Sequence, residues 1–171
     1  MKYPYKKLVV PAKLLENGVL NGKLPAALLA PLLCGGKMYR PVAKKFNEMY
    51  EAALVDGVEL RNIGDYRSFE QQLALFKQRY SLVDEGRKPQ ITRTYKGETW
   101  YLKKKMSPSA TPDPTGKNGS NHGWGLAIDL DVTKVKTARW LMKNAPTYGF
   151  YLQGDNPESR EFELWHWQFC G

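Results

Sequence analysis

The sequence predicts a mixed α+β domain, and three observations favour this class. One segment repeats apolar residues at the three- and four-residue spacing of an amphipathic helix, and a second begins with a helix-capping pattern. Other segments are short, rich in β-branched and aromatic residues, and bounded by glycine or proline, which is typical of strands. The chain of 171 residues, 42% of them apolar and 12% aromatic, suits one globular domain with a full core.

The N-terminal part is predicted to contain a short strand, a series of turns and one long helix. Residues 8–10 (LVV) favour a strand, and residues 16–25 (ENGVLNGKLP) are rich in turn-forming glycine and asparagine. The helix lies between Met38 and Ala53, where one face collects Val42, Phe46, Met49 and Ala53. The longest apolar stretch, Pro25–Cys34, is half the roughly 20 residues of a membrane span and contains prolines. The sequence therefore predicts no membrane insertion.

The central part is predicted to alternate between strand and helix. Residues 58–63 (VELRNI) favour a short strand, and a helix follows from Ser68 to about Tyr80. Ser68 suits the N-cap position, and a glutamine three residues later completes a capping box. Residues 91–105 are typical of a hairpin with a glycine-containing turn, and residues 106–121 favour a loop.

The C-terminal part is predicted to contain two strands with a helix between them. Residues 125–132 (GLAIDLDV) favour a buried strand, residues 138–144 a helix, and residues 161–169 (EFELWHWQF) an aromatic terminal strand. No repeat or linker divides the chain. We therefore expect a single domain over residues 1–171, with residues 1–36 as an N-terminal extension packed on the rest.

The chain has only two histidines, and each lies in a cluster of residues able to bind a metal. His122 belongs to the stretch SNHGWGLAID, which ends at Asp129, and His166 ends the stretch ELWH, which begins at Glu163. Two imidazoles and one carboxylate leave a fourth tetrahedral position open for water, as in hydrolytic zinc sites. A second carboxylate nearby is suited to take the proton of that water.

The spacing of the first cluster predicts a bend in the backbone. His122 and Asp129 are seven residues apart, so a continuous strand would place them on opposite faces. Gly123 and Gly125 allow His122 to approach from a bend while Asp129 projects from the strand itself. Asp131 shares a strand face with Asp129 and remains an alternative ligand at this level.

The spacing of the second cluster predicts a turn. Glu163 and His166 are three residues apart and would oppose each other in a flat strand. Both reach one metal only if the backbone turns or bulges between them, as strands do beside active sites. Asp129 as ligand and Glu163 as base is chemically sensible, because such a ligand set leaves zinc positively charged. The reverse assignment of the two carboxylates stays open.

Three motifs in the right order carry a family resemblance. They are S-x-H-x-x-G-x-A-x-D from Ser120 to Asp129, E-x-W-H from Glu163 to His166, and Y-R-S followed by a glutamine within residues 66–72. Together they resemble the zinc peptidases of the D-Ala-D-Ala carboxypeptidase (VanY-like) family, which includes phage endolysins that cut between L-Ala and D-Glu. The resemblance implies a small antiparallel sheet with flanking helices, similar to hedgehog-type domains and D-Ala-D-Ala peptidases.

The resemblance also implies a role for each matched residue. It implies a zinc ion held by His122, Asp129 and His166. Glu163 would be the general base, and Arg67 would bind substrate or stabilise the oxyanion, for which its rigid positive fork is suited. Four further residues would line the substrate pocket: Ser120, Gln72, Ser68 and Trp165.

The activity implied by the resemblance is hydrolysis of a peptide bond in bacterial peptidoglycan. An endolysin-type L-Ala-D-Glu endopeptidase is the favoured interpretation, and a carboxypeptidase that trims terminal D-Ala is the alternative. A non-catalytic zinc-containing module of the hedgehog type is a further alternative. The net charge of +9 suits an anionic cell envelope, whereas no nucleic-acid-binding motif accompanies the charge, so nucleic acid is not an expected partner.

Features outside these motifs bear on location, assembly and thiol chemistry. The N-terminus has no apolar signal-peptide core. The protein is therefore expected either to be made in a host cytoplasm and released to the wall, or to be secreted with its signal removed. We also expect it to be a monomer. Cys34 and Cys170 lack metal-binding spacing, and the low cysteine count favours two free thiols over one disulfide.

Overall fold

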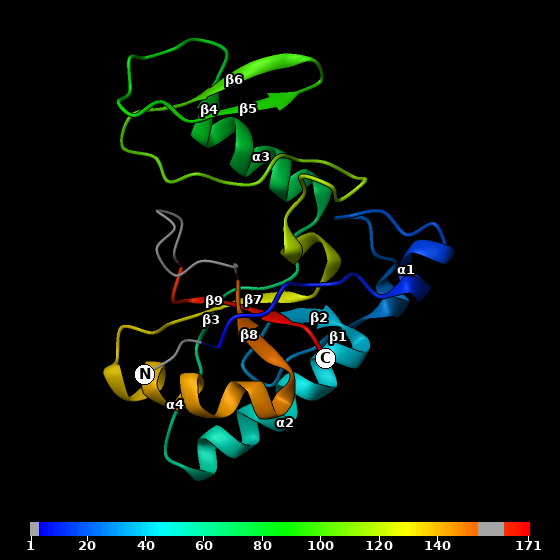
Figure 1. Cartoon of the computed structure of the whole chain (residues 1–171). Helices are drawn as coiled ribbons and strands as arrows, with labels where there is room; N and C mark the ends of the chain where they lie inside the picture. The colour runs from blue at the N-terminus through cyan, green and yellow to red at the C-terminus, as the bar shows by residue number, and fades with distance from the viewer. Residues whose placement is uncertain (1–3, 154–162) are drawn as a thin grey trace.

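A four-stranded antiparallel sheet lies at the centre of the computed structural model, which describes residues 4–153 and 163–171 (Figure 1). Its strands follow the order β3 (Asn62–Gly64), β7 (Ala127–Leu130), β9 (His166–Phe169) and β8 (Phe150–Leu152). The register of β7 and β9 sets Asp129 directly opposite His166. Residues from both predicted metal-binding clusters therefore meet on neighbouring strands, and the predicted α+β class with a small antiparallel sheet is confirmed.

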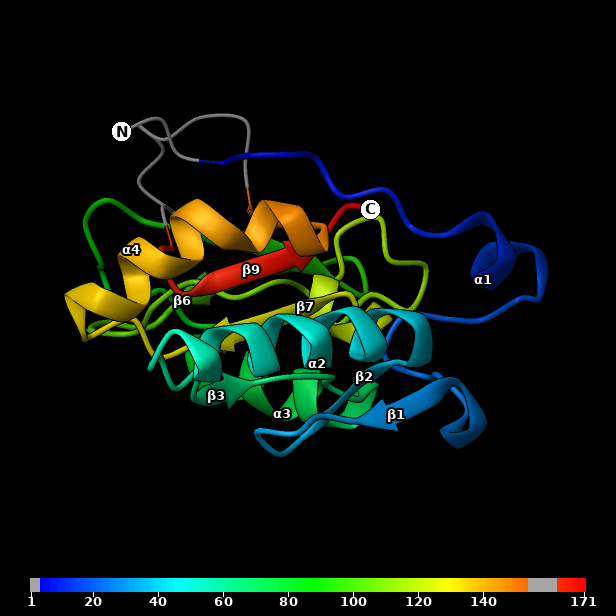
Figure 2. The ribbon, with the colours of Figure 1, turned by 90° about the horizontal axis from the view of Figure 1, so that it is seen from below.

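Two helices, α2 (Arg40–Val55) and α4 (Val135–Asn144), cover one face of this sheet (Figure 2). The predicted apolar face of α2 is confirmed by the burial of Val42, Phe46, Met49 and Ala53. The ring of Phe46 packs edge-on against Phe150 of β8, with the ring centroids 5.9 Å apart. Full burial of a large apolar side chain contributes roughly 1.5–3 kcal/mol, so this layer holds firmly the sheet that carries the site.

A smaller layer lies on the opposite side of the sheet from α2 and α4 (Figure 1). It combines α3 (Phe69–Arg79) with a second sheet in the order β4 (Tyr80–Ser81), β6 (Glu98–Leu102) and β5 (Thr92–Tyr95). This layer has a core of its own, built on the buried side chains of Phe76, Tyr80 and Leu102. It carries α3, whose N-terminal end lies beside the predicted Y-R-S element.

The local predictions for this smaller layer are confirmed. Ser68 caps α3, and Ser68 and Gln71 exchange the two hydrogen bonds of a capping box. The hairpin of β5 and β6 turns at Lys96 and Gly97, whose φ angles are 53° and 80°. Positive φ at both central residues is what a type I′ hairpin turn requires. Residues 106–120 form the predicted loop, which ends one residue earlier than expected because η2 begins at Asn121.

The N-terminal region contains the predicted turns but lacks the predicted strand. It comprises α1 (Ala12–Glu16), η1 (Ala26–Leu28) and a small hairpin of β1 (Leu29–Pro31) with β2 (Lys37–Tyr39). Residues 8–10 are irregular, so that prediction is wrong. The apolar run is short and ends at Pro11, which has no N–H for a ladder and instead precedes α1.

Three other elements are confirmed with shifted boundaries. The strand expected at 58–63 is reduced to β3, which begins at Asn62. The helix expected from residue 138 begins at Val135, and the terminal strand begins at His166. Residues 161 and 162 of that predicted strand lie outside the described residues. Two single-turn helices, η2 (Asn121–Trp124) and η3 (Ala145–Tyr148), complete the fold, and the single-domain organisation stays a prediction.

Within residues 4–153 and 163–171, no helix combines the length and the apolar character that crossing a membrane requires.

Candidate metal centre

Three donor atoms converge where the two predicted clusters meet. His122 Nε2 lies 3.2 Å from His166 Nδ1 and 3.3 Å from Asp129 Oδ1, and the latter two atoms are 3.0 Å apart. A tetrahedral zinc with bonds of about 2.0–2.1 Å to nitrogen and oxygen holds its donors roughly 3.3 Å apart. The three side chains therefore fit one metal ion, and they form such a group within the described residues.

His122 reaches the centre from the predicted bend. It lies in η2, where the Ser120 hydroxyl accepts a hydrogen bond from the His122 N–H at 3.3 Å. Gly125 then ends the turn with φ of 64°, and a Cβ there would lie 2.6 Å from the backbone nitrogen of Tyr39. Glycine is therefore required at this position on both counts. The bend removes the face conflict with Asp129.

The other nitrogen of the His122 ring fixes its tautomer. Nδ1 lies 2.8 Å from the backbone carbonyl oxygen of Asp65, so Nδ1–H donates and Nε2 presents its lone pair to the centre. The Asp65 carboxylate in turn accepts a hydrogen bond from the backbone N–H of Lys37 at 2.6 Å. The residue composition gave no signal for Asp65 in this role, because a backbone carbonyl is present at every position.

Asp129, rather than Asp131, belongs to the group of donors. The Asp129 side chain needs Gly64 on the neighbouring strand, where a Cβ would lie 2.8 Å from Asp129 Oδ2. Burial alone would raise the pKa of Asp129, but its hydrogen bonds to His122 and His166 outweigh burial and hold the pKa well below its ordinary value. The carboxylate is therefore ionised and available to a cation.

Asp131 is engaged elsewhere. Its Oδ1 accepts hydrogen bonds from the Thr133 backbone at 3.0 Å and the Thr133 hydroxyl at 2.6 Å. Its Oδ2 faces Arg61 at 3.4 Å. These contacts form a local turn at the end of β7, so the structure does not bring Asp131 into the centre.

The predicted turn between Glu163 and His166 is present. The two residues between them form a turn, and the His166 N–H donates to the carbonyl oxygen of Glu163 at 3.1 Å. Burial lowers the pKa of both His166 and Arg67, and the charge of Glu163 acts in the opposite direction on each. Glu163 therefore acts electrostatically on both His166 and Arg67, while Trp165 in the turn is 40% exposed.

Arg67 is held beside the three donors by Gln72. Its NH1 donates to Gln72 Oε1 at 3.0 Å, and Gln72 Nε2 donates to the carbonyl oxygen of Ala110 at 2.7 Å. The Arg67 backbone N–H also donates to the His122 carbonyl oxygen at 3.2 Å. Burial lowers the pKa of Arg67, and the charge of Asp129 partly offsets this. Gln72, expected as a pocket residue, is buried and acts on Arg67.

The hydroxyl groups of the two motif serines stabilise the backbone of nearby helical turns. The Ser120 hydroxyl caps the turn that carries His122, and Ser68 caps α3 just after Arg67. Trp124 and Trp167 are buried in the core beside the centre. Among the predicted pocket residues, Trp165 is thus the one with a large exposed surface.

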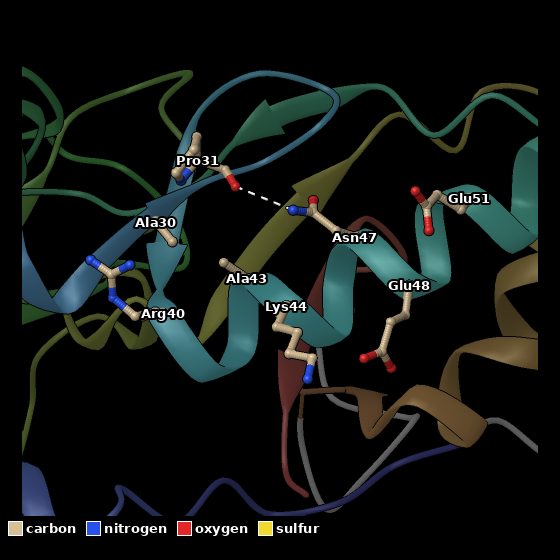
Figure 3. Close-up of a pocket in the computed structure, with 8 residues that line it drawn as sticks. All are labelled: Ala30, Pro31, Arg40, Ala43, Lys44, Asn47, Glu48 and Glu51. Carbon is tan, nitrogen blue, oxygen red and sulfur yellow. Dashed lines mark hydrogen bonds between the residues drawn. The ribbon is translucent and has the colours of Figure 1, made fainter.

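A surface pocket and two cysteines lie outside the group of donors. A shallow pocket of about 440 Å³ between β1 and α2 is lined by residues that include Arg40, Lys44 and Asn47, and Asn47 donates to the Pro31 carbonyl across it (Figure 3). It shares no residue with the donor group. Cys34 and Cys170 are free thiols, as predicted, and burial raises the pKa of Cys34 to about 11. Such a thiol is a poor nucleophile.

Comparison with known families and proteins agrees with the motifs. The family model described as VanY, D-alanyl-D-alanine carboxypeptidase, matches residues 36–171. YodJ of Bacillus subtilis (strain 168), a provisionally assigned carboxypeptidase, is 27% identical over 147 residues. This match covers 77% of the chain and 46% of YodJ, so the chain spans about half the length of that relative.

Solved structures share the fold. One is VanY, a vancomycin-resistance D,D-pentapeptidase from a VanB-type cassette in complex with Zn(II), with a TM-score of 0.55 and 21% identity over 86% of this chain and 83% of that chain. Another is the LD-carboxypeptidase LdcB, with a TM-score of 0.58 and 21% identity over 88% of this chain and 71% of that chain. The predicted fold with a small antiparallel sheet is therefore common to these proteins.

Proposed function

Because the chain belongs to the VanY family of D-alanyl-D-alanine carboxypeptidases, we propose that it is a zinc peptidase that removes the terminal D-Ala from peptidoglycan stem peptides. The observation that carries the proposal is the convergence of His122, Asp129 and His166 beside Glu163 and Arg67. Three protein ligands are the number typical of catalytic zinc, whereas structural zinc is closed by four.

The donor set suits zinc and hydrolysis. Imidazole nitrogens and a carboxylate oxygen are ordinary zinc ligands, and zinc bound there would polarise the substrate carbonyl and lower the pKa of the attacking water. Asp65 keeps His122 in the tautomer that binds a metal, because its carbonyl oxygen holds the Nδ1 proton. The tautomer of His122 is therefore set by the protein itself, before a metal binds.

Glu163 is the proposed general base. Its charge raises the pKa of both His166 and Arg67, and its backbone carbonyl oxygen is bound by the His166 N–H in the turn just before β9. It would accept a proton from the attacking water and deliver that proton to the leaving amine. The intact carboxylate also argues against the non-catalytic alternative, which has no need of a base.

Arg67 is the proposed anchor for substrate. A carboxypeptidase must hold the terminal carboxylate of its substrate, and a guanidinium binds a carboxylate through two parallel hydrogen bonds. NH1 of Arg67 is already fixed by Gln72, so the guanidinium is oriented before substrate binds. Peptidoglycan is the proposed partner at the cell wall, and the monomeric state stays a prediction.

Digestion of purified peptidoglycan followed by mass analysis of the fragments tests the activity. We expect zinc-loaded protein to release D-Ala from pentapeptide stems and to leave the rest of the stem intact. New N-terminal D-Glu would instead establish the endolysin-type endopeptidase, which is the interpretation that the sequence motifs favoured. No cleavage by protein that carries zinc would overturn both.

Loss of the Gln72 side chain should weaken catalysis through Arg67. Because Gln72→Ala releases NH1 of Arg67, we expect kcat/KM on a peptide ending in D-Ala-D-Ala to fall roughly tenfold, the order of one hydrogen bond to a charged group. A rise in KM alone would mean that Arg67 holds the carboxylate, and a fall in kcat alone would mean that it acts in the transition state. Gln78→Ala, on the exposed face of the same helix, is the matched control.

A further inference from the structure

A short N-terminal segment, residues 19–24, lies between the loop that carries His122 and the start of α3. The Gly22 N–H donates to the carbonyl oxygen of Gly123 at 2.7 Å, and the Phe69 N–H donates to the carbonyl oxygen of Gly22 at 2.9 Å. The segment thus connects two parts of the site that are far apart in sequence. It also lies outside residues 36–171, the part matched by the family model.

Asn21 is the centre of this connection. Its side chain is buried, with 4% of its surface exposed, and its Nδ2 donates to the carbonyl oxygen of Ser120 at 2.9 Å. Its backbone N–H donates to the carbonyl oxygen of Pro114 at 2.9 Å. Asn21 therefore holds the loop at two points, one of them two residues before His122.

Two glycines of the loop make room for the Asn21 side chain. A Cβ at Gly123 would lie 2.1 Å from Asn21 Oδ1, and a Cβ at Gly119 would lie 3.0 Å from the same atom. Gly123 does not have positive φ, so its backbone does not require glycine. Glycine is needed at position 123 because the asparagine occupies the space.

These contacts enclose His122 from both sides. Asn21 holds the Ser120 carbonyl before it, and Gly22 holds the Gly123 carbonyl after it. The side chains that orient a metal ligand commonly change metal affinity about 10–100-fold when they are removed. We propose that Asn21 is a positioning residue that sets the His122 loop in its metal-binding geometry, an inference that rests on the proposed zinc site.

Zinc affinity, measured by competition with a chromophoric chelator, tests the role of Asn21. We expect Asn21→Ala to raise the zinc Kd about tenfold or more, the lower end of the outer-shell range. The matched control is Asn17→Ala, because the exposed side chain of Asn17, the C-cap of α1, makes the same kind of bond to the Lys13 carbonyl oxygen at 2.6 Å. The zinc Kd of Asn17→Ala should equal that of the wild type. Equal Kd values for wild type and Asn21→Ala would overturn the inference.

A double-variant cycle separates positioning from simple loss of stability. Gly123→Ala alone should weaken zinc binding, because its methyl group collides with Asn21, whereas the same change in an Asn21→Ala background should add little. Additive effects would contradict the proposed coupling. The absorption spectrum of the cobalt-substituted protein supplies a second readout, and we expect a changed spectrum for Asn21→Ala and an unchanged one for Asn17→Ala.

Two controls keep the outcomes distinct. If the wild type binds no zinc, the proposed function fails, whereas the inference fails only if the wild type binds zinc and Asn21→Ala binds it equally well. The melting temperature of each metal-free variant shows whether it is folded when zinc is titrated. Should Asn21→Ala not fold, Asn21→Ser, which leaves a smaller cavity, decides the question by the same Kd comparison.

Discussion

Replacement of Glu163 by glutamine is expected to abolish peptide hydrolysis while the metal stays bound. Glutamine has nearly the same shape but cannot accept a proton at neutral pH, and a general base contributes about 10²–10⁴-fold to rate. Because the three proposed ligands are other residues, zinc content should remain near one per chain. The measurement pairs kcat on a D-Ala-D-Ala peptide with metal analysis of the same preparation.

Glu98→Gln is the matched control for this experiment. Glu98 is an exposed carboxylate in the hairpin of the smaller layer, outside the donor group, and the same change there should leave kcat as in the wild type. Unchanged turnover in Glu163→Gln would reject Glu163 as the base. Loss of zinc from that variant would instead make Glu163 a ligand, which is the reverse assignment that the spacing of the residues left open.

The sequence was most informative where one physical requirement dominates. The apolar face of α2 is readable because Val42, Phe46 and Met49 follow the helix period, and all three are buried. The bend at Gly125 and the turn before His166 could be predicted because in each cluster two side chains must face one metal ion. In each case one geometric requirement determines the local backbone conformation.

Prediction was weaker where the deciding partner is remote or is a backbone atom. Asp65 acts on His122 through its carbonyl oxygen, which no residue type reveals. Asn21 acts on Ser120 across 99 positions of sequence, and nothing in its neighbourhood distinguishes it from a turn-forming asparagine. The strand expected at residues 8–10 failed for a related reason, since short apolar runs become strands only when a partner edge is present.

Asp129 and Asp131 are distinguished by their partners in the structure and not by their spacing in the sequence. The two residues are two positions apart and share a face of an extended strand, so the strand period could not distinguish them. The structure separates them by their partners: Asp129 faces two histidines, and Asp131 faces Thr133 and Arg61.

Asp129→Asn should remove most of the metal affinity of the protein. The change leaves two imidazoles and a neutral amide, so the site loses its anionic ligand, and we expect the zinc Kd to rise more than the roughly 10–100-fold typical of an outer-shell change. Zinc present at a hundred times its Kd stabilises the folded protein by about 2.7 kcal/mol. This stabilisation should decrease in the variant because its zinc affinity is lower. The measurement is the melting temperature with and without zinc.

Asp131→Asn is the matched control, because it makes the same chemical change two residues away. Asp131 is bound to Thr133 and Arg61 at the end of β7, so its variant should keep the zinc Kd and the zinc-dependent rise in melting temperature of the wild type. If Asp131→Asn lost zinc and Asp129→Asn kept it, the ligand would be Asp131, and β7 would have to shift its register against β9. Because such a shift would separate Asp129 from His166, their direct pairing predicts the first outcome.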